Sequence, residues 1–403
     1  MIRLVASLVL EWLLEMAWGF AKLLIHPVFY FTFLLAAFLG VSRVKRERSH
    51  FHVRAENAYF ELRQLLPLGL LLGSVLSIIM IAAGVVIPLA AILFIAAITI
   101  ILSIRVRLLS SVYTVGLTFF ALFFTAGKDW SIPLFPDLFS SLEDKLYPSI
   151  TVLLALLVIA EGILILKNGK KGTSPKLMTS KRGQRVGVHE LKRVWMLPLL
   201  LLVPGDALQQ LPFEWWPVFN VAGEGYGLLL VPFALGHYQH IQGALPTQAV
   251  SHVGKQIMAH GFVLTAIAIA SYWLPILSLA VVAIGILGRE VIYFSQKTKE
   301  ESGPFYFSKR NQGVMILGVL PHSPSQKMKL SVGEIVSKVN GTIVHNEAEV
   351  YEALQRNRAH CKLEVLDVNG QVRFVQRALY EGDHHELGIL FVQDEKKWGT
   401  EAV

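Results

Sequence analysis

The chain has 403 residues, of which 54% are hydrophobic and 16% are charged, and its formal net charge is +8. An ordinary soluble domain carries about 25% charged residues, so this composition excludes a purely soluble globular protein and favours a membrane protein. The basic excess does not require nucleic acid as a partner, because cytoplasmic loops of membrane proteins collect lysine and arginine. The single cysteine, Cys361, excludes an internal disulfide, and its apolar neighbours predict a buried, unreactive thiol.

The first apolar run follows Arg3 and is interrupted by Glu11 and Glu15, with no clear cleavage site after it. This pattern predicts a retained first helix rather than a removed secretory signal. Glu11 and Glu15 share one helical face. Carboxylates inside a membrane span are often functional, but the simpler interpretation is a face turned to water, to the interface or to a neighbouring helix.

No charged residue occurs between Gln64 and Ile104, a stretch about twice as long as one bilayer crossing requires. We therefore expect two helices here, with the break at Gly84-Val85-Val86-Ile87-Pro88. The other expected helices are 4–22, 27–42, 108–126, 148–166, 194–210, 221–236, 257–273 and 275–291. The two between 194 and 236 are the weakest, because glycine and proline interrupt them. The fold class expected is an α-helical polytopic membrane domain with about 8–10 transmembrane helices.

The loops between these spans differ in charge. Segments 43–63, 105–107 and 167–193 are basic, whereas 127–147 and 205–220 are acidic. The predicted spans place every basic loop on one side of the membrane, and this side is cytoplasmic by the positive-inside rule. The same arrangement predicts that both the N- and the C-terminus are cytoplasmic.

The segment Lys167–Arg193 contains nine basic residues and one acidic residue, Glu190. It is able to dock on anionic lipid headgroups or to bind an acidic partner. The simpler interpretation, which we favour, is an ordinary flexible cytoplasmic loop.

After Phe294 the pattern changes to short apolar runs separated by turns. Asn340-Gly341 and Asn369-Gly370 are hairpin signals, and Asn346 is the expected N-cap of a helix that ends near Arg356. We expect a small α+β domain. The predicted division is a membrane domain over 1–294, a polar linker over 295–304, the α+β domain over 305–395 and a tail over 396–403.

The order of short motifs in this domain resembles a bacterial PDZ domain. Gly313-Val314, Ser323-Pro324, Leu330–Val336 and Val339-Asn340-Gly341 carry the resemblance, although Lys329 and Glu334 depart from the usual pattern. The resemblance implies that a peptide adds as a strand to a free sheet edge, with its carboxylate held by a glycine turn. Two sets of residues are candidates for this site: Gly313, Val314, Met315 and Ile316, or Leu387, Gly388 and Ile389 with Leu390. The alternative is a PDZ-like fold with a closed groove that is used through another surface.

Multi-pass membrane proteins with PDZ domains include site-2-type metalloproteases, which need two histidines and a glutamate on one helix. His189-Glu190 and His385-Glu386 both lack the second histidine, and Gly73-Ser74 lacks the second glycine of a rhomboid-type nucleophile turn. No phosphate-binding loop occurs either. We therefore expect no enzyme, no cofactor and no metal.

Six polar residues are candidates for metal binding or ion transport, which would imply another function: His237, His240, His252, His260, Asp206 and Glu224. The histidines are conceivable metal ligands, but loop or interface positions explain them more simply. The two carboxylates are able to hold a transported ion, but glycine and proline around them favour loops. The alternative functions are a degenerate intramembrane protease whose PDZ domain gates substrates, and a transporter with a regulatory PDZ domain.

The whole chain resembles the MinJ family of cell-division topology proteins. His26–Phe31, Arg43–Arg48 and the order of many spans before one cytoplasmic PDZ domain carry this resemblance. It implies a non-catalytic scaffold in the cell membrane, enriched at septa and poles, that links a DivIVA-like protein to a MinD-like protein and so positions the MinCD division inhibitor. Other division proteins, membrane lipid and self-association remain open as partners, and nucleic acid is not expected.

Overall fold

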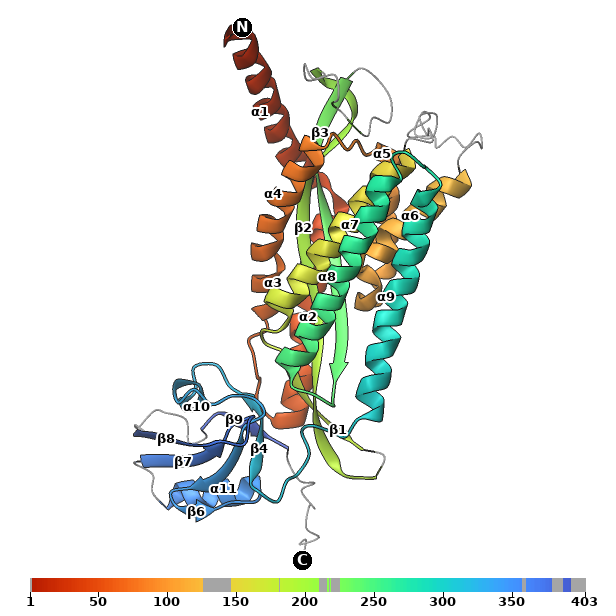
Figure 1. Cartoon of the computed structure of the whole chain (residues 1–403). Helices are drawn as coiled ribbons and strands as arrows, with labels where there is room; N and C mark the ends of the chain where they lie inside the picture. The colour runs from red at the N-terminus through yellow and green to blue at the C-terminus, as the bar shows by residue number, and fades with distance from the viewer. Residues whose placement is uncertain are drawn as a thin grey trace, which may run out of the picture.

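The computed structural model describes residues 2–125, 146–180, 182–209, 216, 218, 225–356, 360–378 and 387–392. Figure 1 shows an elongated body in which helices surround a long β-hairpin, with a smaller C-terminal region at one end. The helices of the body are α1 (Ile2–Ile25), α2 (Pro27–Phe51), α3 (Phe60–Leu65), α4 (Pro67–Ala82), α5 (Leu89–Leu102), η1 (Val106–Leu109), α6 (Ser111–Thr125), α7 (Leu146–Leu164), η2 (Ile165–Gly169), α8 (Pro246–Ala270) and α9 (Leu277–Ser302). Its strands are β1 (Ser174–Thr179), β2 (Arg185–Gln209) and β3 (Gly225–Ile241).

Five helical stretches of the described chain are long and apolar enough to cross a membrane. They are Pro27–Phe51, Phe60–Ala82, Tyr147–Gly169, Pro246–Ala270 and Leu277–Ser302, and the shorter apolar helices α5 and α6 accompany them. The expected break between α4 and α5 is present, because Gly84 adopts a φ of +61° and Pro88 precedes α5. The membrane character of the chain is thus confirmed, but not all of the expected helical spans are present.

The helices expected at 194–210 and 221–236 are wrong: β2 and β3 form an antiparallel hairpin instead. An uninterrupted apolar run fits a buried strand as well as a helix, and periodicity alone does not separate the two. The prolines in these two segments are the sequence signal that argues against helices there. Pro198 lies opposite Pro232 in the register, and Pro204 follows six residues later. Such residues would break helices.

The hairpin is enclosed by helices, and both α4 and the turn after it form hydrogen bonds with its backbone. Leu200 N donates to Ser77 Oγ at 2.8 Å, and Ile87 N donates to Leu202 O at 2.8 Å. Glycine lets α4 approach β2, because a Cβ on Gly73 would lie 2.2 Å from Pro198 O. Exposed sheet edges are not tolerated in hydrocarbon, so this cover is what allows a hairpin at membrane depth.

Helices α1 and α2 follow one another in the same direction along β2. Gly19 of α1 lies beside Leu200, whereas Arg46 of α2 bonds to Glu190. Figure 1 accordingly shows the N-terminus at the end of the body opposite the C-terminal region.

The segment expected as a linker is largely helical, because α9 continues to Ser302. Glu300 accepts hydrogen bonds from Gln242 N at 2.8 Å and Gly243 N at 2.7 Å, which fixes the last turns of α9 against the end of β3. Gly303-Pro304 then ends the helix.

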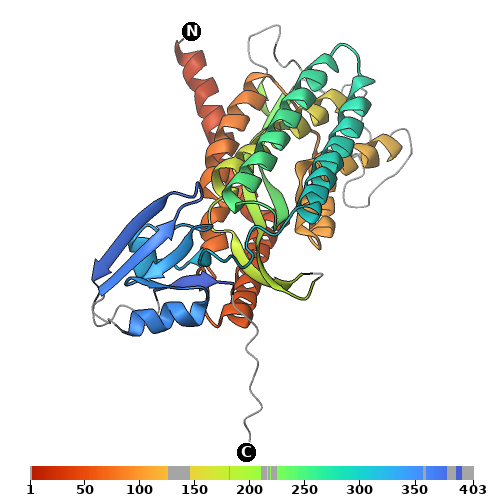
Figure 2. The same cartoon turned by 60° about the horizontal axis from the view of Figure 1, so that its bottom comes forward.

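The C-terminal region contains an antiparallel sheet in the order β8-β7-β5-β4-β9, with β6 beside β5 (Figure 2). Its elements are β4 (Val314–Val319), α10 (Pro324–Lys327), β5 (Ile335–Val339), β6 (Thr342–Ile343), α11 (Glu347–Gln355), β7 (His360–Leu366), β8 (Val372–Ala378) and β9 (Ile389–Phe391). Both predicted hairpins are present, and the Asn346 side chain accepts from Glu349 N as the expected N-cap. Cys361 is buried and free, as expected.

Candidate functional site

The C-terminal sheet has one edge at β9, which pairs with β4 on one side only among the described residues. The turn before it is fixed from inside the domain. Leu387 O accepts from Ser325 N at 3.0 Å, and Gly388 O accepts from Leu320 N at 2.8 Å. Within the described chain, the N–H groups of Leu387 and Gly388 have no backbone acceptor. These two amides lie next to β9, and Leu387 and Ile389 are buried, at 3% and 4% exposure.

Gly388 is required in this turn for two reasons. Its φ is +74°, a left-handed conformation that side chains disfavour, and a Cβ would lie only 2.4 Å from Ser323 Cβ. Ser325 Oγ also donates to Gly388 O at 3.0 Å. The turn is therefore rigidly attached to the short helix α10.

The other predicted set, Gly313–Ile316, lies inside the sheet. Val314 and Met315 pair with β5, while Ile316 pairs with β9. A Cβ on Gly313 would lie 2.3 Å from Val336 O, so close strand packing explains this glycine. Both edges of β4 are therefore occupied, whereas β9 is the last strand of the sheet among the described residues.

The two faces of the C-terminal sheet contact different parts of the molecule. Val314 and Ile316 point into the region's own core, which Ile389 and Phe391 of β9 share with α11. Met315 and Leu317 point the other way, into a second buried cluster that also includes Phe51, Ala55, Leu245, Phe307, Ile335 and Leu390. Three of these, Phe51, Ala55 and Leu245, belong to the body. The sheet is therefore docked on the body through its outer face, and we call this contact the junction.

Hydrogen bonds continue the junction along β2. Gly187 N donates to Phe307 O at 2.8 Å, so Phe307 forms an isolated antiparallel β-bridge with β2. The His189 ring bonds to Leu317 O at 2.9 Å through Nε2 and to Thr173 Oγ1 at 2.9 Å through Nδ1. Burial lowers the pKa of His189 to about 4, so the ring is neutral at physiological pH. One continuous strand thus runs from the centre of the body to the C-terminal sheet.

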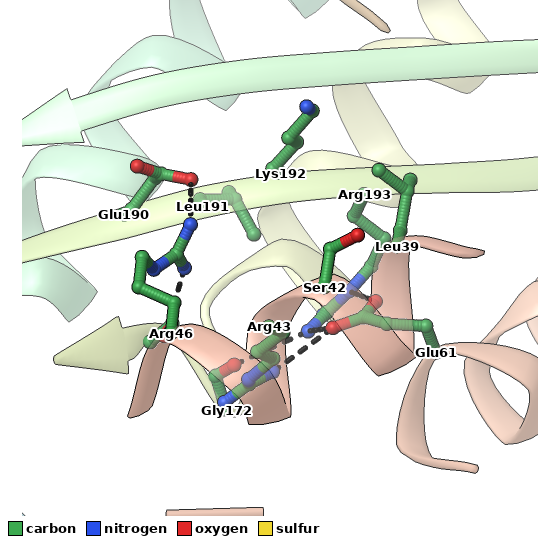
Figure 3. Close-up of a pocket in the computed structure, with 11 residues that line it drawn as sticks. Leu39, Ser42, Arg43, Arg46, Glu61, Gly172, Glu190, Leu191, Lys192 and Arg193 are labelled. Atoms are coloured by element: carbon green, nitrogen blue, oxygen red, sulfur yellow. Dashed lines mark hydrogen bonds and ion pairs between the residues drawn. The ribbon is translucent and has the colours of Figure 1, made fainter. Parts of the chain in front are cut away.

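A buried ion cluster holds α2 and α3 against β2 close to the junction (Figure 3). Glu61 accepts from Arg43 Nη1 at 2.9 Å and from Arg193 Nε at 2.8 Å. Arg193 is fully buried and Glu61 is 3% exposed. Glu47 accepts from Arg43 Nε at 2.9 Å and also from Ala55 N at 2.8 Å, which fixes the turn after α2. Charges buried this deeply are retained only with such pairing.

A second pair extends the cluster toward the junction. Arg46 Nη1 donates to Glu190 at 2.6 Å, and Arg46 Nη2 donates to Ser174 Oγ at 3.0 Å. Ser174 Oγ in turn donates to Glu47 at 2.7 Å. The segment expected as a flexible loop is therefore ordered where it is described, because β1 and the start of β2 are bound to α2.

The sequence did not identify this cluster or the junction. In the sequence, Arg193 stands out only as a loop charge, Arg43 as a loop charge within a family motif, and His189-Glu190 as an incomplete protease motif. The available signal was a pair of arginines and two glutamates next to apolar helices, where unpaired charges would be costly. Their partners lie far apart in the chain, so spacing could not reveal them.

The remaining predicted polar residues form no metal site among the residues described. His237 is buried on β3, between Gln239 and Arg289, and His260 bonds to Gly285 O at 3.2 Å on α9. His252 is exposed on α8. Glu224 and His385 lie outside the described residues, as does the side chain of Asp206.

No protein-family model and no solved structure matches the chain. Curated relatives do. The cell division topological determinant MinJ of Bacillus subtilis (strain 168) is 38% identical over 393 residues, which cover 96% of this chain and 97% of the relative. Probable cell division topological determinants MinJ of Lacticaseibacillus paracasei and Lacticaseibacillus casei (strain BD-II) are 25% identical over 382 residues, covering 93% of this chain and 98% of each relative. Because the first of these matches extends over nearly the whole of both proteins, the chain belongs to the MinJ family.

Proposed function

We propose that this chain is a non-catalytic membrane scaffold for division-site selection. The observation that carries the proposal is its similarity, over nearly the full length, to curated cell division topological determinants. The five apolar spans and the separate sheet region agree with a protein that holds a binding domain at a membrane.

We infer that the C-terminal region, 305–395, is a PDZ domain whose ligand adds to β9. The position of β9 at the end of the strand order among the described residues supports this, as does the glycine turn of Leu387 and Gly388 before it. A peptide added there would gain main-chain hydrogen bonds along the strand, and its carboxylate would meet the backbone donors of the turn. The junction includes Leu390 of β9, so a peptide added to β9 would lie next to the body.

The partners that we propose are a DivIVA-like polar protein and a MinD-like protein, which the chain would link and so position the MinCD inhibitor. A scaffold fixed in the membrane confines its partners to a surface and raises their effective concentration. This role requires binding surfaces and no reaction chemistry.

We propose that the C-terminal region is cytoplasmic. The basic segments 43–63 and 167–193 both lie at the end of the body that carries it, as the Arg46–Glu190 and Gly187–Phe307 contacts require. By the positive-inside rule this end faces the cytoplasm. The course of α1 and α2 favours an N-terminus on the other side, in contrast to the expectation of two cytoplasmic termini.

A fluorescent fusion of the chain in a rod-shaped Gram-positive host tests the division role. We expect fluorescence at septa and poles, and filaments or misplaced septa when the gene is deleted. Uniform membrane fluorescence together with normal division would contradict the proposal.

The binding edge is tested by Gly388→Ala, with Gly370→Ala as the matched control. Both glycines have a positive φ, of +74° and +80°, but a Cβ at Gly370 meets nothing within 4 Å. We expect Gly388→Ala to abolish capture of the DivIVA-like or MinD-like partner by the purified full chain, while Gly370→Ala retains it. Equal capture by both variants would show that the partners bind elsewhere.

A further inference from the structure

A basic hollow lies between the end of η2 and the first half of α8. It has a volume of about 820 Å³. Its lining consists of Lys170, Lys171, Thr247, Gln248, Ser251, His252 and Lys255. None of these residues is acidic. We call this site the basic hollow.

The three lysines of the hollow are exposed. Among the described residues, no carboxylate oxygen lies within 4 Å of their ammonium groups, whereas Lys22, Lys176, Lys297 and Lys338 all have such partners. Thr247 and Ser251 add hydroxyl donors, and Gln248 adds an amide. The hollow therefore offers uncompensated positive charge together with neutral donors, a combination that suits a phosphate group.

The hollow lies at the end of the body that carries the C-terminal region. Gly172 follows Lys171 and accepts from Arg193 Nη2 at 3.3 Å, and Leu245, just before α8, belongs to the junction. Figure 1 shows this end of α8 nearest the C-terminal region.

The exposed face of α8 places the hollow at the level of the lipid headgroups. Gln248, His252 and Lys255 lie on this face, and the same face continues as Phe262, Val263 and Ile269, which are 57%, 54% and 50% exposed. It thus changes from basic to apolar within about two helical turns. An apolar face of a spanning helix meets lipid tails, so the basic part just before it meets their phosphates.

This continuity favours a lipid over an acidic polypeptide. A polypeptide would use the lysines alone, whereas a phospholipid places its phosphate in the hollow and its acyl chains along Phe262 and Val263. A second cavity of about 240 Å³, between β3 and α9, lacks this character because Glu300 and Glu301 line it together with Arg107, Arg289 and Lys297.

We propose that the basic hollow binds the phosphate headgroup of an anionic phospholipid in the cytoplasmic leaflet. Such a site would bind selectively at one place between two helices, in addition to the general attraction between basic loops and an anionic membrane.

The test measures lipid binding to the purified full chain in detergent by native mass spectrometry, with phosphatidylglycerol and phosphatidylcholine as probes. The variant is Lys170→Gln, Lys171→Gln and Lys255→Gln combined. The matched control neutralises three exposed lysines outside the hollow, Lys45→Gln, Lys192→Gln and Lys299→Gln combined. A third variant changes the three hollow lysines to arginine, which keeps their charge.

We expect the hollow variant to bind phosphatidylglycerol at least about tenfold more weakly than the unchanged chain, because each lysine near an anionic lipid contributes roughly fivefold. The control and the arginine variant should stay within about threefold, and phosphatidylcholine binding should not change. Thermal unfolding of each variant in detergent without added lipid establishes that it is folded.

Three results would overturn the proposal. Equal weakening by the hollow variant and the control would mean diffuse attraction only. Competition by inorganic phosphate at the same concentration as phosphatidylglycerol would identify a site for free phosphate. Lysine-dependent binding of poly-glutamate without lysine-dependent binding of phosphatidylglycerol would identify a surface for an acidic protein.

Discussion

The molecule contains two β-structures that are stabilised in different ways. The hairpin of β2 and β3 lies among helices, and its backbone and side chains are covered by α1, α4 and η1. The C-terminal sheet has its own core, in which α11 packs against alternate residues of β4, β7 and β9. The hairpin should therefore depend on the helices around it, whereas the C-terminal sheet should retain its structure when the body is disturbed.

The largest effect should come from the ion cluster that holds the hairpin in the body. Arg193→Met leaves Glu61 without one of its two arginine partners, in a site where both side chains are almost fully buried. Removing one partner of a buried ion pair typically costs about 3–5 kcal/mol. We expect a strong loss of folded protein, measured by thermal unfolding in detergent.

The matched control for Arg193→Met is Arg356→Met. Arg356 pairs with Glu352 at 2.9 Å, but their side chains are 65% and 68% exposed, so the thermal midpoint should hardly move. If both variants unfold at the same temperature as the unchanged chain, the cluster does not stabilise the hairpin.

The difference between the two β-structures also decides how much of each the sequence predicts. In the C-terminal region, Asn340-Gly341, Asn369-Gly370 and Asn346 each act on their immediate neighbours, and the elements formed as expected. In the hairpin, β2 is buried on both faces from Val194 to Leu199, so no alternation of polar and apolar residues distinguishes it from a helix.

The sequence likewise predicts the local part of the candidate site but not the contacts made across the fold. The glycine turn at Gly388 is a local signal. The sequence therefore predicts it as a candidate carboxylate-binding turn, together with the turn at Gly313. The pairing of strands distinguishes their positions, because β4 has a neighbour on each side and β9 is last in the strand order of the described residues. The junction depends on Phe51, Leu245 and Phe307 meeting across the fold, which no local pattern indicates.

The next largest loss of stability should come from substituting the glycines at which α4 packs closely against β2. Gly69→Ala would place a Cβ 1.9 Å from Met196 O, and Gly73→Ala would place one 2.2 Å from Pro198 O. Each should destabilise the body by about 1–3 kcal/mol, as overpacking does. Gly116→Ala on α6 is the control, because its nearest neighbours are flexible side chains at 3.3 Å or more. The measurement is the thermal unfolding midpoint of each of the three variants in detergent. If Gly73→Ala has the same midpoint as Gly116→Ala, α4 and β2 are not in tight contact.

The junction should weaken in acid because His189 is buried and neutral. Its pKa is about 4 when docked, below the ordinary value near 6.5, so the undocked state binds the proton more readily. The contribution of His189 is complete above about pH 6.5 and falls by up to about 1.4 kcal/mol per pH unit between 6.5 and 4.

Hydrogen exchange of the Gly187 amide measures this effect, because that N–H donates across the junction to Phe307 O. After correction for the intrinsic pH dependence of exchange, protection should fall as the pH is lowered from 6.5 to 5. His189→Gln removes the titrating group and should flatten this dependence. Protection that falls equally in His189→Gln would assign the acid sensitivity to another group.

The smallest expected effect is on the reactivity of Cys361, and it tests most directly whether the C-terminal sheet stays folded when the hairpin and its helices unfold. Cys361 lies in the core of the C-terminal sheet, and burial raises the pKa of its thiol to about 12, so almost none of it is thiolate at pH 7.5. We expect no measurable alkylation by iodoacetamide in the native chain and rapid alkylation in denaturant. In Arg193→Met the thiol should remain protected while the body unfolds, because the sheet has its own core. Alkylation that keeps pace with unfolding of the body would show instead that the C-terminal sheet depends on the junction as the hairpin depends on its helices.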